Sequence, residues 1–507
     1  MKLIKKIAAI MFAFMMVVSM SCNVKAEEGT TPTTETGEGK ITINNAIPRQ
    51  TYTIYKILDL ESYRSNVVEG NEIGNFAYKP SSEWKAFLEG DDINNKYITF
   101  DGEYVLWKEN ADPAAFAKLA LDYAKKDGSP VKAYEEKSAP DASTGQTTST
   151  VTFDKLSLGY YLVDSSVGAL CSLDTTKPGA TIQEKNGVPS VEKGVSNAKN
   201  GTYGTSNNAS IGDKVYFKTT ITAQKGAQNY VLHDKMTAGL KFNGNVEVKK
   251  GESPVATSYY TLKTSDFNDD CTFEIVFGQT FCDDLQKDEK ITVTYSATLN
   301  ENAVIGNDAN TNTNKTLLSY GDSQKTTEVT TNTKTFEMNV FKFYKDKKNS
   351  DKETGLAGAT FKLTKDSQNA ENIGFVKTSN KTATNDVYRV AKKGETDTVT
   401  TITSPKSGKF TIQGLGAGTY YLTETKQPDG YNKLSGPVTV VIDKDGQVKV
   451  KNGDAYDEVT QVKVENKSGT VLPSTGGAGT TMIYLVGAVL VLGSGVVLAT
   501  KRRVKNK

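Results

Sequence analysis

The chain has 507 residues, with 61 lysines and arginines against 59 aspartates and glutamates, and its net charge is +2. It contains one histidine, His233, which argues against a zinc site of several imidazoles and against a Ser-His-Asp triad. No basic stripe with interleaved aromatic residues points to a nucleic-acid partner. We therefore expect a protein that is not an enzyme, binds no nucleic acid, and needs neither a cofactor nor a metal.

The N-terminus has the pattern of an export signal. Lysines precede an apolar run over residues 7–18, and Ala26 fits a cleavage site. Residues 1–26 are therefore predicted to be a secretory signal peptide, absent from the mature protein. The Thr-, Glu- and Gly-rich segment 27–39 that follows is predicted to be disordered.

Most of the remaining chain alternates apolar and polar residues, as β-strands do. Short strands separated by turn signals predict an all-β fold of tandem immunoglobulin-like β-sandwich domains. In one example Val438–Ile442 is followed by Asp445-Gly446 and then by a second alternating run, which predicts a hairpin. Polar linkers divide the chain into an N-terminal domain (40–186), a middle domain (187–335), a C-terminal domain (336–468) and a terminal segment (469–507).

A helical insertion is predicted within the N-terminal domain. Asp112 is a good N-cap, Pro113 suits the first helical position and Gly128 ends the segment. The residues expected on the buried face are Phe116, Leu119, Ala120 and Tyr123. A shorter helix is expected around Trp84, Phe87 and Leu88.

Three cysteines remain once the signal peptide is removed: Cys171, Cys271 and Cys282. Three cysteines in a large exported chain are not a disulfide framework. We favour buried thiols, and a disulfide between Cys271 and Cys282 stays an alternative.

Three strands of the C-terminal domain each place one polar residue on their apolar face. Strand alternation directs Lys342, Glu424 and Asn466 inward together with their apolar neighbours. Burial of an unpaired charge costs several kcal/mol, so these three residues should contact one another. They form either a buried ion pair bonded to an amide or a covalent cross-link, in which a neutral lysine attacks the asparagine side chain and ammonia leaves.

The same parity recurs in the middle domain. Lys193, Asp234 and Asn314 each share a strand face with apolar residues. Asn312 has the same parity as Asn314 and is the second candidate for the amide.

The C-terminal segment combines three features in order. The pentapeptide Leu472, Pro473, Ser474, Thr475 and Gly476 comes first. An uncharged apolar stretch over 482–499 follows, with 18 residues, enough to cross a hydrocarbon layer of ~30 Å. The basic tail 501–507 would hold the C-terminus in the cytoplasm.

This ordered triple resembles the cell-wall sorting signal of Gram-positive surface proteins, in which a sortase cuts after the threonine, here Thr475. The stretch 408–431 resembles the signature of the collagen-adhesin (Cna) type-B domain, and the middle domain resembles the type-A-like domain of sortase-assembled major pilins. These resemblances imply isopeptide bonds Lys342–Asn466, promoted by Glu424, and Lys193–Asn314, promoted by Asp234. A possible third set is Lys56, Asn186 and Asp164, with Asp164 at the place of the usual glutamate.

The amine to which the acyl group of Thr475 is transferred distinguishes a pilus subunit from a monomeric wall-anchored adhesin. Only five residues, 467–471, separate Asn466 from the pentapeptide, a tether of under ~20 Å, whereas a lone adhesin needs a long stalk. Lys185 lies at the first domain junction, where major pilins carry their linking lysine. The resemblance thus implies a pilus shaft subunit, polymerised by sortase through Lys185 and anchored to peptidoglycan at the cell surface. Minor pilins or host ligands are further expected partners. The alternative is a monomeric wall-anchored adhesin.

Overall fold

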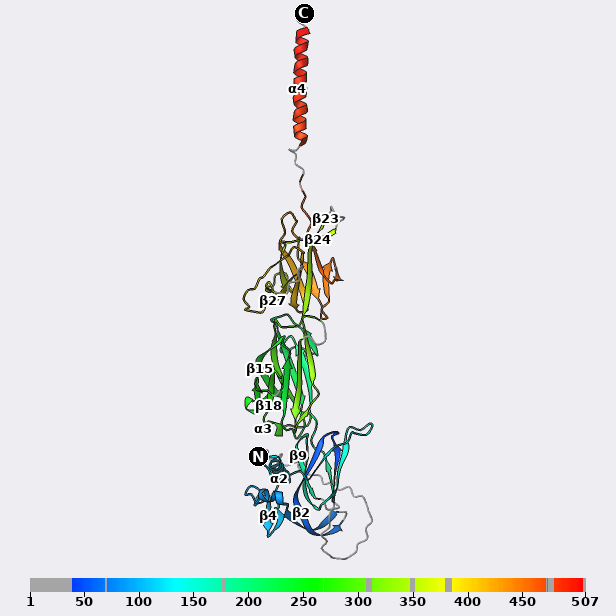
Figure 1. Cartoon of the computed structure of the whole chain (residues 1–507), viewed down its shortest axis with the longest axis vertical. Coiled ribbons are helices and arrows are strands. Elements are labelled where there is room, and N and C mark those ends of the chain that lie inside the picture. The colour runs from blue at the N-terminus through cyan, green and yellow to red at the C-terminus, as the bar shows by residue number, and fades with distance from the viewer. Residues whose placement is uncertain are drawn as a thin grey trace, which may run out of the picture. The chain divides into compact units, whose positions relative to one another are not determined.

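A computed structural model describes residues 39–68, 71–175, 179–267, 269–306, 312–346, 352–378, 385–470, 472 and 478–504. Contacts divide the chain into two compact units (Figure 1), one mainly of residues up to Thr333 and the other mainly of residues from Lys334 onward. The strands of the first unit fall into an N-terminal region (39–183) and a middle region (190–334). The second unit contains the C-terminal region (336–466) and a terminal helix. The predicted signal peptide lies outside the described residues.

The N-terminal region contains two sheets that share a core. One has the order β10 (Ala180–Gln183), β1 (Gly39–Ala46), β7 (Ser149–Leu156). The other has the order β3 (Asn71–Pro80), β2 (Thr51–Val68), β8 (Gly159–Ser165), β9 (Gly168–Thr175), with β6 (Glu135–Ser138) also paired to β2. Apolar residues of β1, β2, β7 and β8 are packed together between the sheets. Gly39, the last residue of the segment predicted to be disordered, begins β1 and pairs with Leu156.

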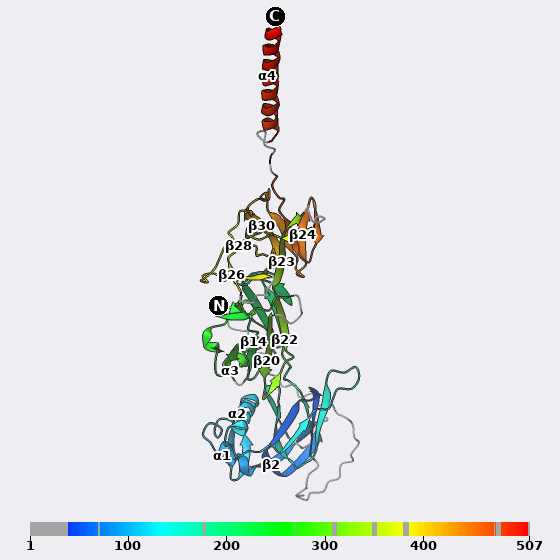
Figure 2. The same ribbon diagram turned by 45° about the horizontal axis from the view of Figure 1, so that its top comes forward.

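Helices cover the other face of the β2–β8 sheet (Figure 2). The short η1 (Ser82–Trp84) and α1 (Lys85–Leu88) precede the hairpin of β4 (Ile98–Asp101) and β5 (Tyr104–Trp107), and α2 (Pro113–Lys125) follows. The Asp112 carboxylate accepts hydrogen bonds from the backbone amides of Ala114 and Ala115, as predicted for an N-cap. Of the four residues predicted on the buried face, Phe116 and Ala120 are buried and Tyr123 is partly buried. The buried residues are Phe116, Ala117, Ala120, Leu121 and Ala124, while Leu119 is exposed.

The middle region is built from two sheets. The first has the order β11 (Ser190–Ser196), β13 (Lys214–Thr222), β19 (Lys290–Leu299), β15 (Leu240–Lys250), β16 (Ser253–Pro254). The second has the order β12 (Ser206–Asn208), β22 (Val329–Lys334), β20 (Asn312–Tyr320), β14 (Val231–Met236), β18 (Phe273–Phe277), β17 (Tyr260–Lys263), with β21 (Gln324–Lys325) paired to β20. Helices η2 (Thr257–Tyr259) and α3 (Gln279–Asp283) lie in the connections.

The C-terminal region also has two sheets around one core. The first has the order β24 (Lys352–Gly355), β23 (Phe336–Asp346), β29 (Lys409–Leu415), β27 (Asp386–Val390), β26 (Phe375–Lys377), with β34 (Val462–Glu465) parallel to β23. The second has the order β28 (Ile402–Thr403), β25 (Thr360–Lys365), β30 (Gly418–Lys426), β31 (Val438–Ile442), β32 (Val448–Asn452), β33 (Ala455–Glu458). The predicted hairpin is present as β31 and β32, with Gly446 at a positive φ of 84° in the turn. The all-β fold class is confirmed.

Helix α4 (Ala478–Val504) contains the predicted apolar stretch. Its segment Met482–Arg502 is long and apolar enough to cross a membrane, with a mean hydropathy of 2.4 and no part buried against the rest of the chain.

Candidate functional site

The C-terminal region brings Lys342, Glu424 and Asn466 together in its core, and we name these residues the C-terminal triad. Lys342 lies on β23 and pairs in register with Val464 of the parallel strand β34. Asn466 follows Val464 by two residues along the chain. Glu424 lies on β30 in the facing sheet. The side chains of Lys342 and Glu424 are fully buried, and Asn466 is 1% exposed.

In the C-terminal triad Glu424 is hydrogen-bonded to Asn466, whereas Lys342 is too far from Glu424 for a hydrogen bond. The Lys342 Nζ donates to the Val464 carbonyl at 3.0 Å and lies 4.0 Å from Glu424 Oε1. Glu424 Oε2 accepts hydrogen bonds from the Leu434 backbone amide at 2.8 Å and from Asn466 Nδ2 at 3.2 Å. Burial lowers the pKa of Lys342 to about 8, so about a tenth of this amine is neutral and nucleophilic at pH 7.

The middle region assembles a second set of the same residue types, Lys193, Asp234 and Asn314, which we name the middle triad. Lys193 lies on β11 of one sheet, whereas Asp234 and Asn314 lie on the adjacent strands β14 and β20 of the other. Lys193 Nζ lies 2.6 Å from Asp234 Oδ2, and both side chains are fully buried. Burial lowers the pKa of Lys193 and raises the pKa of Asp234, so both groups are shifted towards their neutral forms.

Tyr295 is a member of the middle site that sequence reasoning did not assign. Its hydroxyl contacts all three triad residues: it accepts from Lys193 Nζ and from Asn314 Nδ2, and it donates to Asp234 Oδ2. The alternation of β19 places this tyrosine on an apolar face. A phenol hydroxyl that points into a core needs a polar partner, and that was the available signal.

The two triads leave equivalent atoms without a hydrogen bond. In each, one oxygen of the acid and the amide oxygen of the asparagine are buried and have no partner among the described residues. The atoms are Asp234 Oδ1 and Asn314 Oδ1 in the middle triad, and Glu424 Oε1 and Asn466 Oδ1 in the C-terminal triad. A protonated carboxyl would supply the donor that the amide oxygen lacks.

Asn312, the alternative acceptor, is equally buried but faces a different neighbour. Its Nδ2 donates to the Thr333 carbonyl of β22 at 3.0 Å. Asn314, in contrast, contacts the hydroxyl of Tyr295 that also binds Lys193. The contacts therefore favour Asn314.

The third set predicted from the sequence is not brought together. Asp164 pairs across the sheet with Thr53, whereas Lys56 pairs with Tyr161. These positions have opposite parity, so the two side chains point to opposite faces of the sheet. Lys56 instead pairs with Asp59, and Asp164 pairs with Lys125 of α2 at 2.7 Å. Burial raises the pKa of Asp164 to about 6, although Lys125 opposes the shift.

Lys185 is exposed, two residues beyond the end of β10, whereas the next residue, Asn186, is buried. The Glu184 carboxylate accepts hydrogen bonds from the backbone amides of both residues at 2.8 Å, which holds the turn. Lys185 lies at a shallow depression that Ile43, Tyr52 and Ile182 also line.

Of the predicted sortase motif, Leu472 is described and is 81% exposed. Pro473, Ser474, Thr475 and Gly476 lie outside the described residues.

Cys271 and Cys282 are both free thiols; Cys282 is buried, as favoured from the sequence, whereas Cys271 is only partly buried. The side chain of Cys171 lies outside the described part of the chain.

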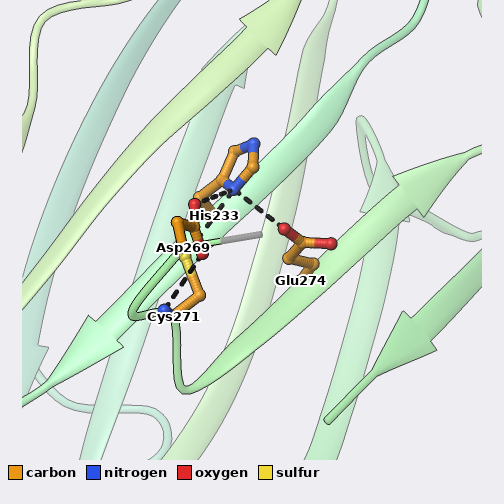
Figure 3. A group of neighbouring side chains, drawn as sticks. All are labelled: His233, Asp269, Cys271 and Glu274. Carbon is orange, nitrogen blue, oxygen red and sulfur yellow. Dashed lines mark hydrogen bonds and ion pairs between the residues drawn. The ribbon is translucent and has the colours of Figure 1, made fainter. Parts of the chain in front are cut away.

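The structure also shows a group of side chains, of types that can ligate a metal, that was not predicted. His233, Asp269, Cys271 and Glu274 converge on one point (Figure 3).

Three family descriptions match the chain. Residues 211–324 match the Gram-positive pilin backbone subunit 2, Cna-B-like domain. Residues 342–455 match the SpaA prealbumin-like fold domain, and residues 464–507 match the LPXTG cell wall anchor motif. The middle match is described as Cna-B-like, where the resemblance implied a type-A-like domain. The alternation of residues along the strands cannot distinguish a type-A-like from a type-B-like domain, because an inward lysine, acid and asparagine produce the same pattern in both.

Solved structures of backbone pilins are similar to this chain, and one of them reaches a TM-score of 0.50. The T6 backbone pilin of Streptococcus pyogenes is 16% identical, with a TM-score of 0.50, over 86% of this chain and 99% of that one. The full-length major pilin SpaD of Corynebacterium diphtheriae is 18% identical, with a TM-score of 0.43, over 87% of this chain and 100% of that one. No curated protein matches this sequence.

The middle match describes a pilin backbone subunit, and the terminal match describes the anchor that sortase processes. Both motifs lie in one chain, in the order expected for an exported subunit that is cut near its C-terminus and joined to others at the cell wall. Together the three matches have the arrangement of a sortase-assembled backbone pilin of Gram-positive bacteria, a subunit of the pilus shaft.

Proposed function

We propose that successive copies of this subunit are joined by an amide bond between Thr475 of one copy and Lys185 of the next. Each subunit would in addition be reinforced by two internal isopeptide bonds, Lys193–Asn314 and Lys342–Asn466. The observation that carries the internal bonds is the repetition of one arrangement: a fully buried lysine, acid and asparagine occur together in two separate cores.

The proposed internal reaction balances without an external reagent. The neutral Nζ of lysine attacks Cγ of asparagine, and the protonated acid donates its proton to the amide oxygen. Collapse of the tetrahedral intermediate breaks the Cγ–Nδ2 bond. The nitrogen leaves as ammonia, the acid recovers a proton, and a lysine–asparagine amide remains. The lowered pKa of Lys342 and the raised pKa of Asp234 both favour the neutral forms that this route requires.

In this proposal Asp234 and Glu424 each act once, within their own chain, and the subunit is not a turnover enzyme. The regions containing the two triads would be separate domains (187–335 and 336–468), preceded by an N-terminal domain (40–186). Minor pilins and host surface ligands belong to the proposal as further partners of the assembled shaft.

The exposure of Lys185 supports its role as the linking amine, because a sortase acyl-enzyme must reach the nucleophile from solvent. By contrast, the lysines of both triads are buried and cannot meet a second protein. Each contact would join a site near the N-terminal region of one copy to the C-terminus of another. Because the two sites differ and the contact does not close into a ring, repeated contacts produce a fibre.

Immunoblots of boiled cell-wall extracts test this linkage. Wild-type chain should give a ladder of multimers that resists detergent and reductant. Lys185→Ala should reduce the ladder to one wall-linked or secreted band, whereas Lys225→Ala, a change at another exposed loop lysine, should keep it. A ladder that persists in Lys185→Ala would exclude Lys185 as the linking residue. A single band in the wild type would favour a monomeric adhesin.

A further inference from the structure

We propose that His233, Asp269, Cys271 and Glu274 form a zinc-binding site in the middle region, independent of the isopeptide chemistry. The four side chains offer one imidazole nitrogen, one sulfur and two carboxylate oxygens, and these atoms all lie within 4.8 Å of one another. It is the one such group among the residues that the structure describes.

Two adjacent strands and one turn bring the four donors together. His233 on β14 and Glu274 on β18 are register partners in an antiparallel pair, which places their side chains side by side on one face. Asp269 and Cys271 precede β18 in the turn that leads into it. Figure 3 shows the side chains of Asp269, Cys271 and Glu274 gathered beside one nitrogen of the His233 ring.

The spacing of the donors suits a tetrahedral ion. His233 Nδ1 lies 3.1 Å from Asp269 Oδ2, 3.1 Å from Glu274 Oε1 and 3.6 Å from Cys271 Sγ. Zinc bonds of about 2.0–2.3 Å in a tetrahedron separate neighbouring ligand atoms by roughly 3.3–3.8 Å. Small movements of side chains would therefore complete the site. The mixture of thiolate, imidazole and carboxylate favours zinc over calcium or magnesium, which prefer ligand sets of oxygen alone.

Outer contacts orient two of the donors. The other ring nitrogen of His233, Nε2, lies 2.9 Å from the hydroxyl of Ser319 on β20. The Cys271 backbone amide donates to Asp269 Oδ1 at 3.1 Å, which leaves Oδ2 directed at the ring. Such second-shell hydrogen bonds fix the ring orientation of metal-ligating histidines.

Asp269 Oδ2 and Glu274 Oε1 both lie 3.1 Å from His233 Nδ1, and Cys271 Sγ lies 3.6 Å from the same nitrogen. A bound cation would attract both carboxylates and would also use the sulfur, which supplies the fourth ligand of a zinc site. Asp269 has a side chain that is 40% exposed and gives an ion access from solvent.

Zinc would tie the turn containing Asp269 and Cys271 to β14. Binding replaces the sulfur–hydrogen bond of Cys271 with a sulfur–zinc bond, and the proton passes to solvent. Asp234, the acid of the middle triad, is the next residue on β14 and points to the opposite face. The ion would thus brace the strand that holds this acid.

The test uses the chain from residue 27 to residue 471, reduced, treated with a chelator and then freed of it. Titration with zinc chloride should saturate at one equivalent and raise the melting temperature, because an ion that binds the native state stabilises it. Cobalt(II) in place of zinc should give a thiolate-to-cobalt charge-transfer band that reports the bond to Cys271.

Substitutions identify the ligands. Cys271→Ser should abolish the charge-transfer band and weaken zinc binding at least about tenfold. Glu274→Gln should weaken binding but keep the band. The matched controls are Cys282→Ala and Asp270→Asn, which remove the second free thiol of the described residues and an acid beside the cluster, and both should bind like the wild type. An absence of saturable binding, or equal binding by Cys271→Ser and wild type, would overturn the proposal.

Discussion

Lys342 of β23 pairs with Val464 of the parallel strand β34, and Asn466 follows two residues later, immediately after the end of β34. Adjacent strands are about 4.8 Å apart and two residues span about 6.6 Å, a separation that an extended lysine side chain covers. A bond between these residues would join the first and last strands of the C-terminal region. The loop that it closes contains 124 residues (466 − 342).

Loss of this bond should weaken the C-terminal region markedly. In the chain-entropy account a cross-link across 100 residues is worth about 4.7 kcal/mol. Lys342→Met keeps most of the side-chain volume but removes the amine, so we expect a loss of roughly 4 kcal/mol and rapid cleavage by trypsin. Calorimetry of the secreted chain measures the effect. Lys345→Ala, at an exposed position of β23, serves as the control. A melting temperature of Lys342→Met within a degree or two of the control would contradict this role.

Tyr295 should assist the reaction in the middle triad, because its hydroxyl contacts the amine, the acid and the amide. Tyr295→Phe keeps the ring and removes those contacts. We expect formation of the Lys193–Asn314 bond to slow at least about tenfold, since a positioned proton donor commonly contributes more than that. Mass spectra recorded at intervals after refolding follow the loss of ammonia. Tyr320→Phe, a change at another buried tyrosine, should react at the wild-type rate.

Asn314 should be the acceptor, rather than Asn312. Asn314→Ala should be lighter than its own sequence by one ammonia instead of two, because no side-chain amide then faces Lys193. Asn312→Ala removes a hydrogen bond to Thr333 and should lower stability while the cross-link still forms. Peptide mapping distinguishes the two, and a cross-linked peptide containing Asn312 in the Asn314→Ala chain would show that the assignment is reversed.

Asp164 should make the N-terminal region more stable at mildly acid pH. Its folded pKa, about 6, lies above the ordinary value of 3.8, so the folded state takes up the proton first as the pH falls. The cost of the buried charge is therefore fully present above pH 6 and is relieved between about pH 6 and pH 4. Asp164→Asn should stabilise this region at pH 7, by at most about 3 kcal/mol for a shift of about two pKa units.

Loss of the ion pair with Lys125 offsets part of that gain. Thermal unfolding of both chains between pH 4 and pH 8 checks the sign. The difference between them should shrink as the pH falls, and a difference that grows towards acid pH would contradict the account.

Strand parity predicted the three positions of the C-terminal triad, and in the middle triad it predicted Lys193 and Asp234 but left Asn312 and Asn314 both open. It did not predict the partner of Asp164, since Lys125 lies on helix α2 and strand alternation does not say how a helix packs on a sheet. Tyr295 looks apolar in a strand pattern, and its hydroxyl becomes significant only when Lys193 and Asp234 face it across the core. The zinc-ligand cluster depends on the register of β14 with β18, which pairs His233 with a residue 41 positions away.

The intact mass of the chain from residue 27 to residue 471 tests the central claim most directly. Two internal isopeptide bonds make the wild type lighter than its sequence by two molecules of ammonia. Asp234→Ala and Glu424→Ala should each restore one of them, and the double variant should have the full sequence mass. A wild-type mass equal to that of the sequence would contradict the account, because both triads would then be buried ion pairs without a covalent bond.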